Sequence, residues 1–170
     1  MKVNLIAIIS ILILGCAKTE KFKENIEKDD FYEKCRKLVL SENKIGKEYL
    51  FQNVGNKIDE LNVKYLGNSV LKNGDTIRII TSVNYTGLYE DSRKANASIY
   101  LYNFKNQKIG YYNVGGVFNL PSEIKNNSMI FRFENEQCNQ TTLIKLYDSI
   151  PRNIYVKCTP EAGDIYDLQK

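Results

Sequence analysis

The pattern of hydrophobic and polar residues changes twice along this chain. Residues 3–14 are almost entirely apolar, with only Asn4 and Ser10 polar. Over residues 30–42 apolar side chains recur every three or four positions, and from about residue 48 they alternate with polar ones. The first spacing predicts a helix with one buried face, and the alternation predicts half-buried strands. We therefore expect one helix followed by a mainly β region.

The helix predicted over residues 30–42 has one apolar stripe. Its members stand at i, i+4, i+7 and i+8, the spacing of a single helix face, and are Phe31, Cys35, Leu38 and Val39. Asp30 can cap the first turn, with Glu33 three residues further on, as in a capping box. We expect the helix to end before Gly46, because glycine is common directly after the last helical residue. We expect the stripe to bury against one face of the sheet that follows.

Turn signals divide the alternating region into about seven or eight short strands. Asn73-Gly74 predicts a tight turn before a strand at residues 77–85. Residues 85–97 are polar and contain glycine, which predicts a loop. Further strands are expected at residues 61–65, 98–104, 109–114, 129–133, 141–147, 153–158 and 165–168. This spacing favours an antiparallel β-sandwich, or an open barrel, with one N-terminal α-helix.

The beginning of the chain has the layout of an export signal. Lys2 supplies a positive charge, an apolar run follows, and Gly15 is a small residue directly before Cys16. A basic start, a short apolar stretch and a small residue at its end are typical of a secretory signal peptide. The apolar run is shorter than the roughly 20 residues that a membrane-spanning helix needs.

The segment Leu12-Ile13-Leu14-Gly15-Cys16 resembles the lipobox of bacterial lipoprotein precursors. The resemblance implies that a peptidase cleaves before Cys16 and that this cysteine carries fatty acyl chains. Each buried methylene of such a chain contributes about 0.8 kcal/mol to membrane binding. Ile13 departs from the family, in which leucine is commonest at that position. Ala17 follows the cysteine in place of aspartate, which by resemblance favours the outer membrane over the inner.

These features predict a division of the chain into three parts. Residues 1–15 are a cleaved signal peptide, residues 16–29 a lipidated tether, and residues 30–170 a single globular domain. The tether is charged and short, so it keeps the domain close to the bilayer. No family resemblance extends to the part after Cys16.

The composition excludes several classes of function, mainly because one residue type is absent. The chain has no histidine, which removes the usual Ser-His-Asp and Cys-His systems, His-ligated zinc, and the commonest general base at neutral pH. The 24 Lys and Arg residues nearly balance 20 Asp and Glu residues, without a dense basic cluster. We therefore expect no catalytic residues, no cofactor or metal, and no nucleic-acid partner.

Besides Cys16, the chain has Cys35, Cys138 and Cys158. Export leads to an oxidising compartment in which disulfides form. Cys138 and Cys158 flank a predicted hairpin that turns at residues 148–151, midway between them, so they can form a bridge or remain two buried thiols. Cys35 is interpreted as a small apolar residue of the helix face.

One aromatic cluster is a candidate binding surface. Tyr100, Tyr102 and Phe104 alternate on one predicted strand, and Tyr111 lies on the next. If residue 104 pairs with residue 109, Tyr102 faces Tyr111. Exposed tyrosines can stack on sugars or contact a protein, whereas buried ones form an ordinary cross-strand ladder.

Acidic residues form a weaker candidate site. Glu161, Asp164 and Asp167 lie near the end of the chain, and Glu90-Asp91 lies in the predicted loop. Their spacing matches no calcium loop. Carboxylate catalysis would require two of them to share one cleft.

We therefore expect a lipid-anchored, non-enzymatic binding domain of the cell envelope, whose partner is another protein in the periplasm or at the cell surface. One alternative is a glycan-binding module that uses Tyr100, Tyr102 and Tyr111. Others are a membrane-anchored immunity or inhibitor protein and a structural role in the envelope. Glycan binding requires exposed, coplanar tyrosines, whereas protein binding requires exposed apolar surface.

Overall fold

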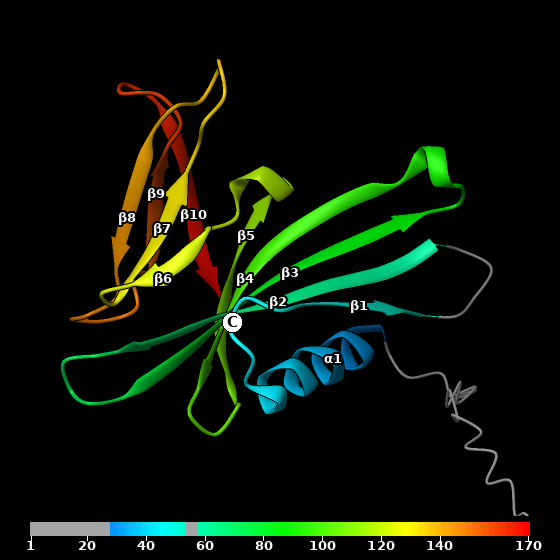
Figure 1. Cartoon of the computed structure of the whole chain (residues 1–170), viewed down its shortest axis with the longest axis horizontal. Helices are drawn as coiled ribbons and strands as arrows, with labels where there is room; N and C mark the ends of the chain where they lie inside the picture. Colours follow the sequence, from blue (N-terminus) through cyan, green and yellow to red (C-terminus); the bar gives the residue numbers. More distant parts are fainter. Residues whose placement is uncertain (1–27, 54–57) are drawn as a thin grey trace, which may run out of the picture.

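The computed structural model describes residues 28–53 and 58–170 (Figure 1). The expected signal peptide, Cys16 and most of the expected tether lie outside the described residues. Helix α1 spans Lys28–Glu42, and the 3-10 helices are η1, Glu90–Ser92, and η2, Val117–Asn119. The strands are β1 Glu48–Gln52, β2 Ile58–Val70, β3 Thr76–Gly87, β4 Lys94–Asn103, β5 Lys108–Gly115, β6 Glu123–Lys125, β7 Ser128–Arg132, β8 Thr141–Lys145, β9 Asn153–Lys157 and β10 Gly163–Gln169.

The strands form two antiparallel sheets. The larger has the order β1-β2-β3-β4-β5-β10-β9, and the smaller the order β6-β7-β8. The small sheet packs on one face of the large one, and their edges approach where β2 meets β6 and where β8 meets β9. The predicted mainly β, sandwich-like fold with an N-terminal helix is confirmed. The described residues contain ten strands, more than predicted, because the pattern did not separate β1 and the three-residue β6 as strands of their own.

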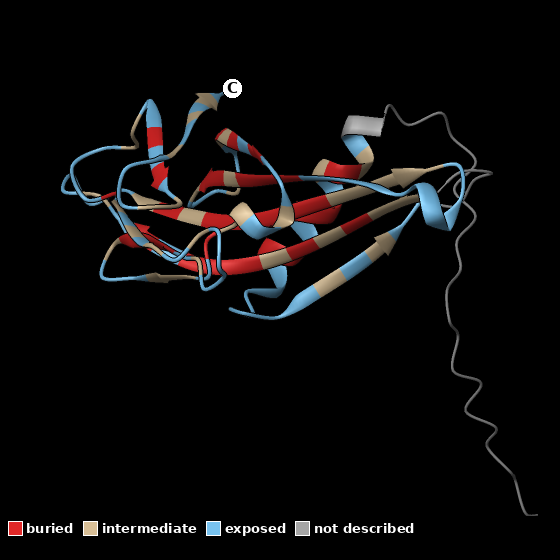
Figure 2. Cartoon of the chain, turned by 90° about the horizontal axis from the view of Figure 1, so that it is seen from above, coloured by how far each residue is buried: buried red, intermediate tan, exposed pale blue. Residues whose placement is uncertain are grey.

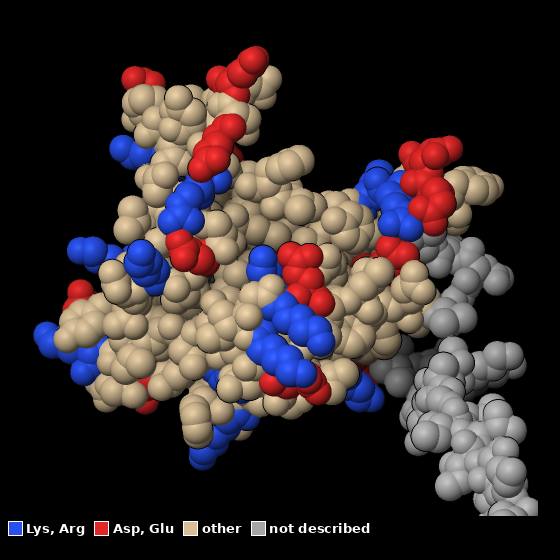
Figure 3. Space-filling view, viewed as in Figure 1, with Lys and Arg blue, Asp and Glu red and all other residues tan. Residues whose placement is uncertain are grey.

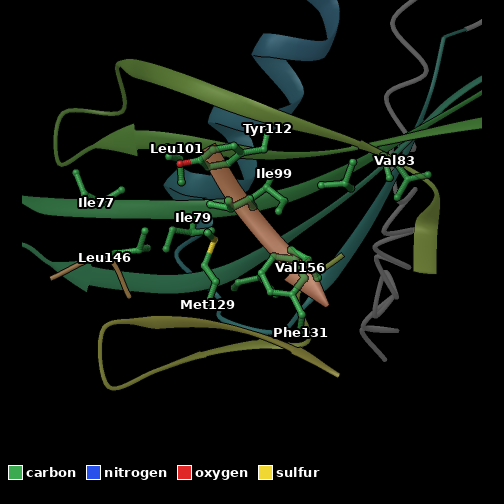
Figure 4. Close-up of a cluster of buried hydrophobic side chains, with 14 residues drawn as sticks. Ile77, Ile79, Val83, Ile99, Leu101, Tyr112, Met129, Phe131, Leu146 and Val156 are labelled. Atoms are coloured by element: carbon green, nitrogen blue, oxygen red, sulfur yellow. The ribbon is translucent and has the colours of Figure 1, made fainter. Parts of the chain in front are cut away.

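The main core lies between the two sheets (Figure 4). The large sheet contributes alternate residues of β3, β4 and β5, such as Ile79, Ile99 and Tyr112, and β7 contributes Met129 and Phe131. All five side chains are fully buried. Burying one such aliphatic side chain contributes about 1.5–3 kcal/mol to stability. The period of two in the sequence thus marks the face that meets the small sheet.

A second core lies on the opposite face of the large sheet, under α1. Val39 and Leu40 of the helix pack there with Leu61 and Val63 of β2 and Ile80 of β3. The centre of β3 is therefore buried on both faces, and Figure 2 shows buried segments running through the middle of the sheet. This explains why its sequence is apolar at consecutive positions.

The buried face of α1 is rotated from the predicted stripe. Tyr32, Cys35 and Arg36 are buried with Val39, whereas Leu38 is 52% exposed. The prediction of Leu38 as a core residue is wrong. Tyr32 and Arg36 place their apolar parts against the sheet while their polar ends form hydrogen bonds.

The ends of α1 also differ from the prediction in part. The helix begins at Lys28, so Asp30 lies inside the first turn and does not cap it. The helix ends before Gly46, as predicted. At this end Arg78 of β3 donates a hydrogen bond to the carbonyl oxygen of Leu40 at 2.7 Å. Arg78 thereby adds a second donor to a carbonyl group of the last helical turn, to which the amide of Asn43 also donates at 3.2 Å.

Strands β3 and β4 continue past the core as an extended arm. Residues 85–97 were predicted to be a loop, and this is wrong at both ends of the range, because β3 runs to Gly87 and β4 begins at Lys94. Backbone pairing does not require apolar side chains, so the polar sequence concealed the strands. The turn of the arm exposes Leu88 and Tyr89.

The two strands beside the last cysteines belong to different sheets. β8 pairs with β7 and β9 pairs with β10, so the hairpin predicted between β8 and β9 is wrong. A disulfide joins Cys138 to Cys158, whose Cα atoms are 4.5 Å apart. Close by, the amide of Lys157 donates to the hydroxyl of Thr142 at 3.0 Å. The disulfide therefore links the two sheets at the edge where β8 meets β9.

Candidate binding groove

Tyr100 on β4 and Tyr111 on β5 are direct cross-strand partners. The predicted pairing of Tyr102 with Tyr111 is wrong, because Tyr111 pairs with Tyr100, and an irregularity after Leu101 places Tyr102 opposite Lys108. The rings of Tyr100 and Tyr111 are stacked, with centroids 5.2 Å apart and planes at 17°. The pair lies on the same side of the sheet as α1, because both rings line a groove with helix residues.

The other two aromatic residues of the predicted surface lie elsewhere. Tyr102 is fully buried beneath α1, and its hydroxyl donates to Oε2 of Glu33 at 2.8 Å. Phe104 is 77% exposed, in the turn between β4 and β5. The four aromatic residues therefore do not form one accessible row. Tyr102 is a core residue, and Tyr100 and Tyr111 are the members that face the groove.

This groove lies between the first half of α1 and the β4–β5 hairpin. It has a volume of about 410 Å³ and opens to solvent. Its lining combines aromatic rings with charges of both signs, and the residues are Asp30, Tyr32, Glu33, Arg36, Tyr100, Lys108 and Tyr111. Elsewhere too, basic and acidic side chains are interspersed on the face seen in Figure 3. The groove is the feature that we take as the candidate functional site.

Arg36 connects the helix to the sheet in this groove, although it is only 5% exposed. Its Nε and Nη2 atoms donate to Oε2 of Glu33 at 3.3 and 3.1 Å, and Nε also lies 3.1 Å from the hydroxyl of Tyr102. Its guanidinium carbon lies 3.9 Å from the ring centroid of Tyr100. Burial alone would lower the pKa of Arg36, but Tyr100, Tyr102 and Glu33 outweigh that effect and raise it. The guanidinium therefore stays charged.

Two groups beside Arg36 are held neutral. Burial raises the pKa of the Tyr102 hydroxyl well above its ordinary value, an effect that the charge of Arg36 opposes. Burial likewise raises the pKa of the Cys35 thiol from 9.0 to about 11, again with Arg36 opposing. Because the thiolate is the reactive form of cysteine, Cys35 serves packing at neutral pH.

The ring faces of the tyrosine pair are already used inside the protein. Tyr100 contacts both the guanidinium of Arg36 and the ring of Tyr111. Nζ of Lys108 lies 5.7 Å from the ring centroid of Tyr111. A sugar that stacks on tyrosine requires an open ring face. The arrangement is a stack of Arg36, Tyr100 and Tyr111 and not a coplanar platform.

The acidic residues singled out in the sequence are not brought together. Glu90 and Asp91 form part of η1, at the end of the β3–β4 arm (Figure 1). Glu161, Asp164 and Asp167 lie on or beside β10, which lies away from the arm in that view. None of the five lines the groove.

The groove has two carboxylates of its own, and both are in salt bridges. Asp30 pairs with Lys34 at 2.8 Å, and Glu33 pairs with Arg36 at 3.1 Å. Within residues 28–53 and 58–170, no cluster of Cys, Asp and Glu is arranged to hold a metal ion. In the same part of the chain, no helix is long and apolar enough to cross a bilayer.

Sequence reasoning found the sheet half of the groove and missed the helix half. Arg36 was overlooked because a charged residue was not expected on the buried side of α1. One signal could have revealed it: Tyr32, Cys35, Arg36 and Val39 share a helix face as regular as the predicted stripe. Lys108 was overlooked because its place opposite Tyr102 depends on the register shift.

Comparisons of the chain with protein families, with curated proteins and with solved structures found no match.

Proposed function

We propose that the chain is the precursor of a bacterial lipoprotein, cleaved before Cys16 and held at a membrane by acyl chains on that residue. We further propose that the domain is a non-enzymatic binding module whose partner is another protein of the cell envelope. The anchor is supported by the signal-like residues 1–15 and the lipobox-like segment that they end in. Ala17 favours the outer membrane, by the same resemblance.

The observation that carries the binding proposal is the groove beside α1. Tyrosine and arginine are among the residue types that are enriched at the energetic hot spots of protein interfaces. Here two partly exposed tyrosines, Tyr100 and Tyr111, stand with Arg36 in one solvent-open groove. Their side chains are fixed by stacking and hydrogen bonds, so little conformational entropy is lost when a partner binds.

Exposed apolar side chains supply a second line of support. At the end of the β3–β4 arm, Leu88 and Tyr89 are 61% and 73% exposed, and Phe118 of η2 is 88% exposed. Leu88 and Tyr89 are neighbours, and the apolar surface that they expose together is suited to contact with another protein. The alternative of a glycan-binding module is less well supported, because the tyrosines stack on one another.

The anchor and the groove lie near each other along the chain. Cys16 precedes Lys28, the first residue of α1, by twelve positions. At about 3.5 Å per residue, the intervening segment spans at most roughly 40 Å. The first turns of α1 line the groove through Asp30 and Glu33. A partner in the groove would therefore be bound close to the membrane. Such a position suits a partner that is an envelope protein. If the chain is an immunity protein, it suits an incoming toxin.

A capture experiment tests the binding proposal. Protein with a C-terminal tag is isolated from its native envelope in mild detergent, and proteins and glycans that accompany it are identified by mass spectrometry. A stoichiometric protein partner, reduced when Tyr111→Ala replaces the wild type, supports the proposal. Capture of glycan alone, or of a partner that is indifferent to Tyr111, contradicts it.

A further inference from the structure

We infer that the groove binds a carboxylate of an acidic protein segment, held by Arg36 and Lys108 beside the ring of Tyr111. The inference rests on the proposed function and names the chemistry of the partner. It follows from hydrogen-bond donors and positive charge that the fold leaves available in the groove.

Arg36 has donors that the protein does not use. A guanidinium has five N–H groups, and Glu33 and Tyr102 engage only those on Nε and Nη2. Nη1 has no hydrogen-bond partner within residues 28–53 and 58–170. Buried polar atoms without a partner are costly, and in the same described part of the chain only the Tyr49 hydroxyl is both sealed and unpaired. The free donors of Arg36 must therefore reach solvent, and the groove that it lines provides the opening.

Lys108 supplies a second cation at the same groove. It is exposed, and its ammonium forms no salt bridge with any residue that the structure describes. By contrast, Lys34 and Lys37 on the helix are paired with Asp30 and Glu33. Lys108 is thus the lining cation without an acidic partner, and it stands beside Tyr111.

The charges of the groove favour a carboxylate over a phosphate. Asp30 and Glu33 already bring negative charge to the lining, so a dianionic phosphate would be repelled more strongly than a single carboxylate. A planar carboxylate also matches the fork of a guanidinium. The ring of Tyr111, which lies next to Lys108, can contact the aliphatic part of an aspartate or glutamate side chain.

Glutamate peptides test this inference on the purified full-length mature protein in detergent. Fluorescein-labelled hexaglutamate is titrated with the protein at low salt, and polarisation is recorded. Hexaglutamine of the same length and an oligomer of glucuronate serve as neutral and sugar probes. We expect saturable binding of hexaglutamate that weakens as salt rises, with little binding of hexaglutamine.

Two substitutions localise the binding. Lys108→Gln is expected to weaken hexaglutamate binding about threefold to fivefold, the range of one partly exposed ion pair. Lys105→Gln is the matched control, because it removes the same charge from the same hairpin outside the groove lining. Tyr111→Leu is expected to weaken binding as well. Arg36 is left intact because it is buried and structural.

Several outcomes would overturn the inference. They are absence of hexaglutamate binding, equal binding of hexaglutamine, equal effects of Lys105→Gln and Lys108→Gln, or binding of glucuronate without binding of the peptide. If hexaglutamate does not bind while a protein partner is still captured from the envelope in a manner that depends on Tyr111, the inference of a carboxylate ligand is wrong and the proposed function is retained. If neither a peptide nor a protein partner binds, both fall.

Discussion

The guanidinium carbon of Arg36 lies 3.9 Å from the ring centroid of Tyr100, and this contact joins α1 to the β4–β5 hairpin. The same guanidinium is paired with Glu33 on its own helix. One nearly buried cation thus fixes both the position of the helix and the shape of the groove.

We expect that replacing only Arg36 lowers the free energy of unfolding more than replacing Arg36 and Glu33 together. Arg36→Leu leaves the carboxylate of Glu33 without its main partner and should lower the free energy of unfolding by about 3 kcal/mol. Replacing both residues by leucine should recover a large part of that loss. Urea unfolding at neutral pH measures both effects. A double variant no more stable than Arg36→Leu alone would contradict this account of the pair.

Two leucines of α1 test which face of the helix is buried. Leu40→Ala removes a fully buried side chain and should cost about 2–5 kcal/mol. Leu38→Ala removes a side chain that is more than half exposed and should change stability by less than about 0.5 kcal/mol. Thermal or urea unfolding of the two variants provides a matched comparison. A larger loss for Leu38→Ala than for Leu40→Ala would mean that the helix packs through the stripe that the sequence predicted.

The disulfide between Cys138 and Cys158 should contribute measurably to stability. The two residues are 20 positions apart, and closing a loop of that length stabilises a fold by roughly 3 kcal/mol. Replacing both cysteines by serine should lower the urea midpoint by a corresponding amount. Adding a reductant to this variant should have no further effect. A midpoint that does not differ from the wild type would count against the bridge as a stabilising link.

The thiol of Cys35 should react slowly until the pH is strongly alkaline. Burial raises its pKa to about 11, and only the thiolate is alkylated. In the folded protein, iodoacetamide labelling at Cys35 should therefore rise about tenfold per pH unit from pH 7 to 10. An unfolded chain should instead level off above about pH 9. Mass spectrometry measures the labelling rate of Cys35 at each pH and distinguishes the profile of the folded protein from that of the unfolded chain.

The raised pKa of Cys35 also makes the stability of the protein depend on pH. Because folding raises the pKa of Cys35, the folded state holds its proton more tightly than the unfolded state. This contribution is present below pH 9 and declines as the pH approaches 11. Burial raises the pKa of Tyr166 to about 12, in the same direction. Stability should therefore fall on the alkaline side, and a urea midpoint that rises between pH 9 and 11 would contradict this.

The sequence predicted the strands of the core well because one buried face imposes a period of two. Ile79 and Val83 follow that rule, and both are buried. The period of two did not predict strands in segments that pair across the sheet but bury few side chains. At the ends of β3 and β4, residues 86–87 and 94–96 pair across the sheet with few apolar side chains, so the hydropathy pattern gives no signal of a strand there.

The groove was harder to predict because it depends on two features that hydropathy does not encode. The first is the register of the β4–β5 pair, in which Tyr100 lies opposite Tyr111 and an irregularity after Leu101 places Tyr102 opposite Lys108. The second is a buried arginine, whose charge is tolerated because Glu33 and Tyr102 solvate it. Both features require knowledge of neighbours that are distant in sequence.

The most direct test of this account is whether Cys16 carries the lipid anchor that we propose. Cells that express the full chain are fed an alkyne analogue of palmitate, and the protein is followed by click labelling, membrane fractionation and intact mass. The account predicts that the wild-type protein is labelled, membrane-bound and shortened by residues 1–15. It also predicts that Cys16→Ser accumulates as an unlabelled precursor of full length. If Cys16→Ser is processed, labelled and located like the wild type, the lipid-anchored function proposed for this domain is contradicted.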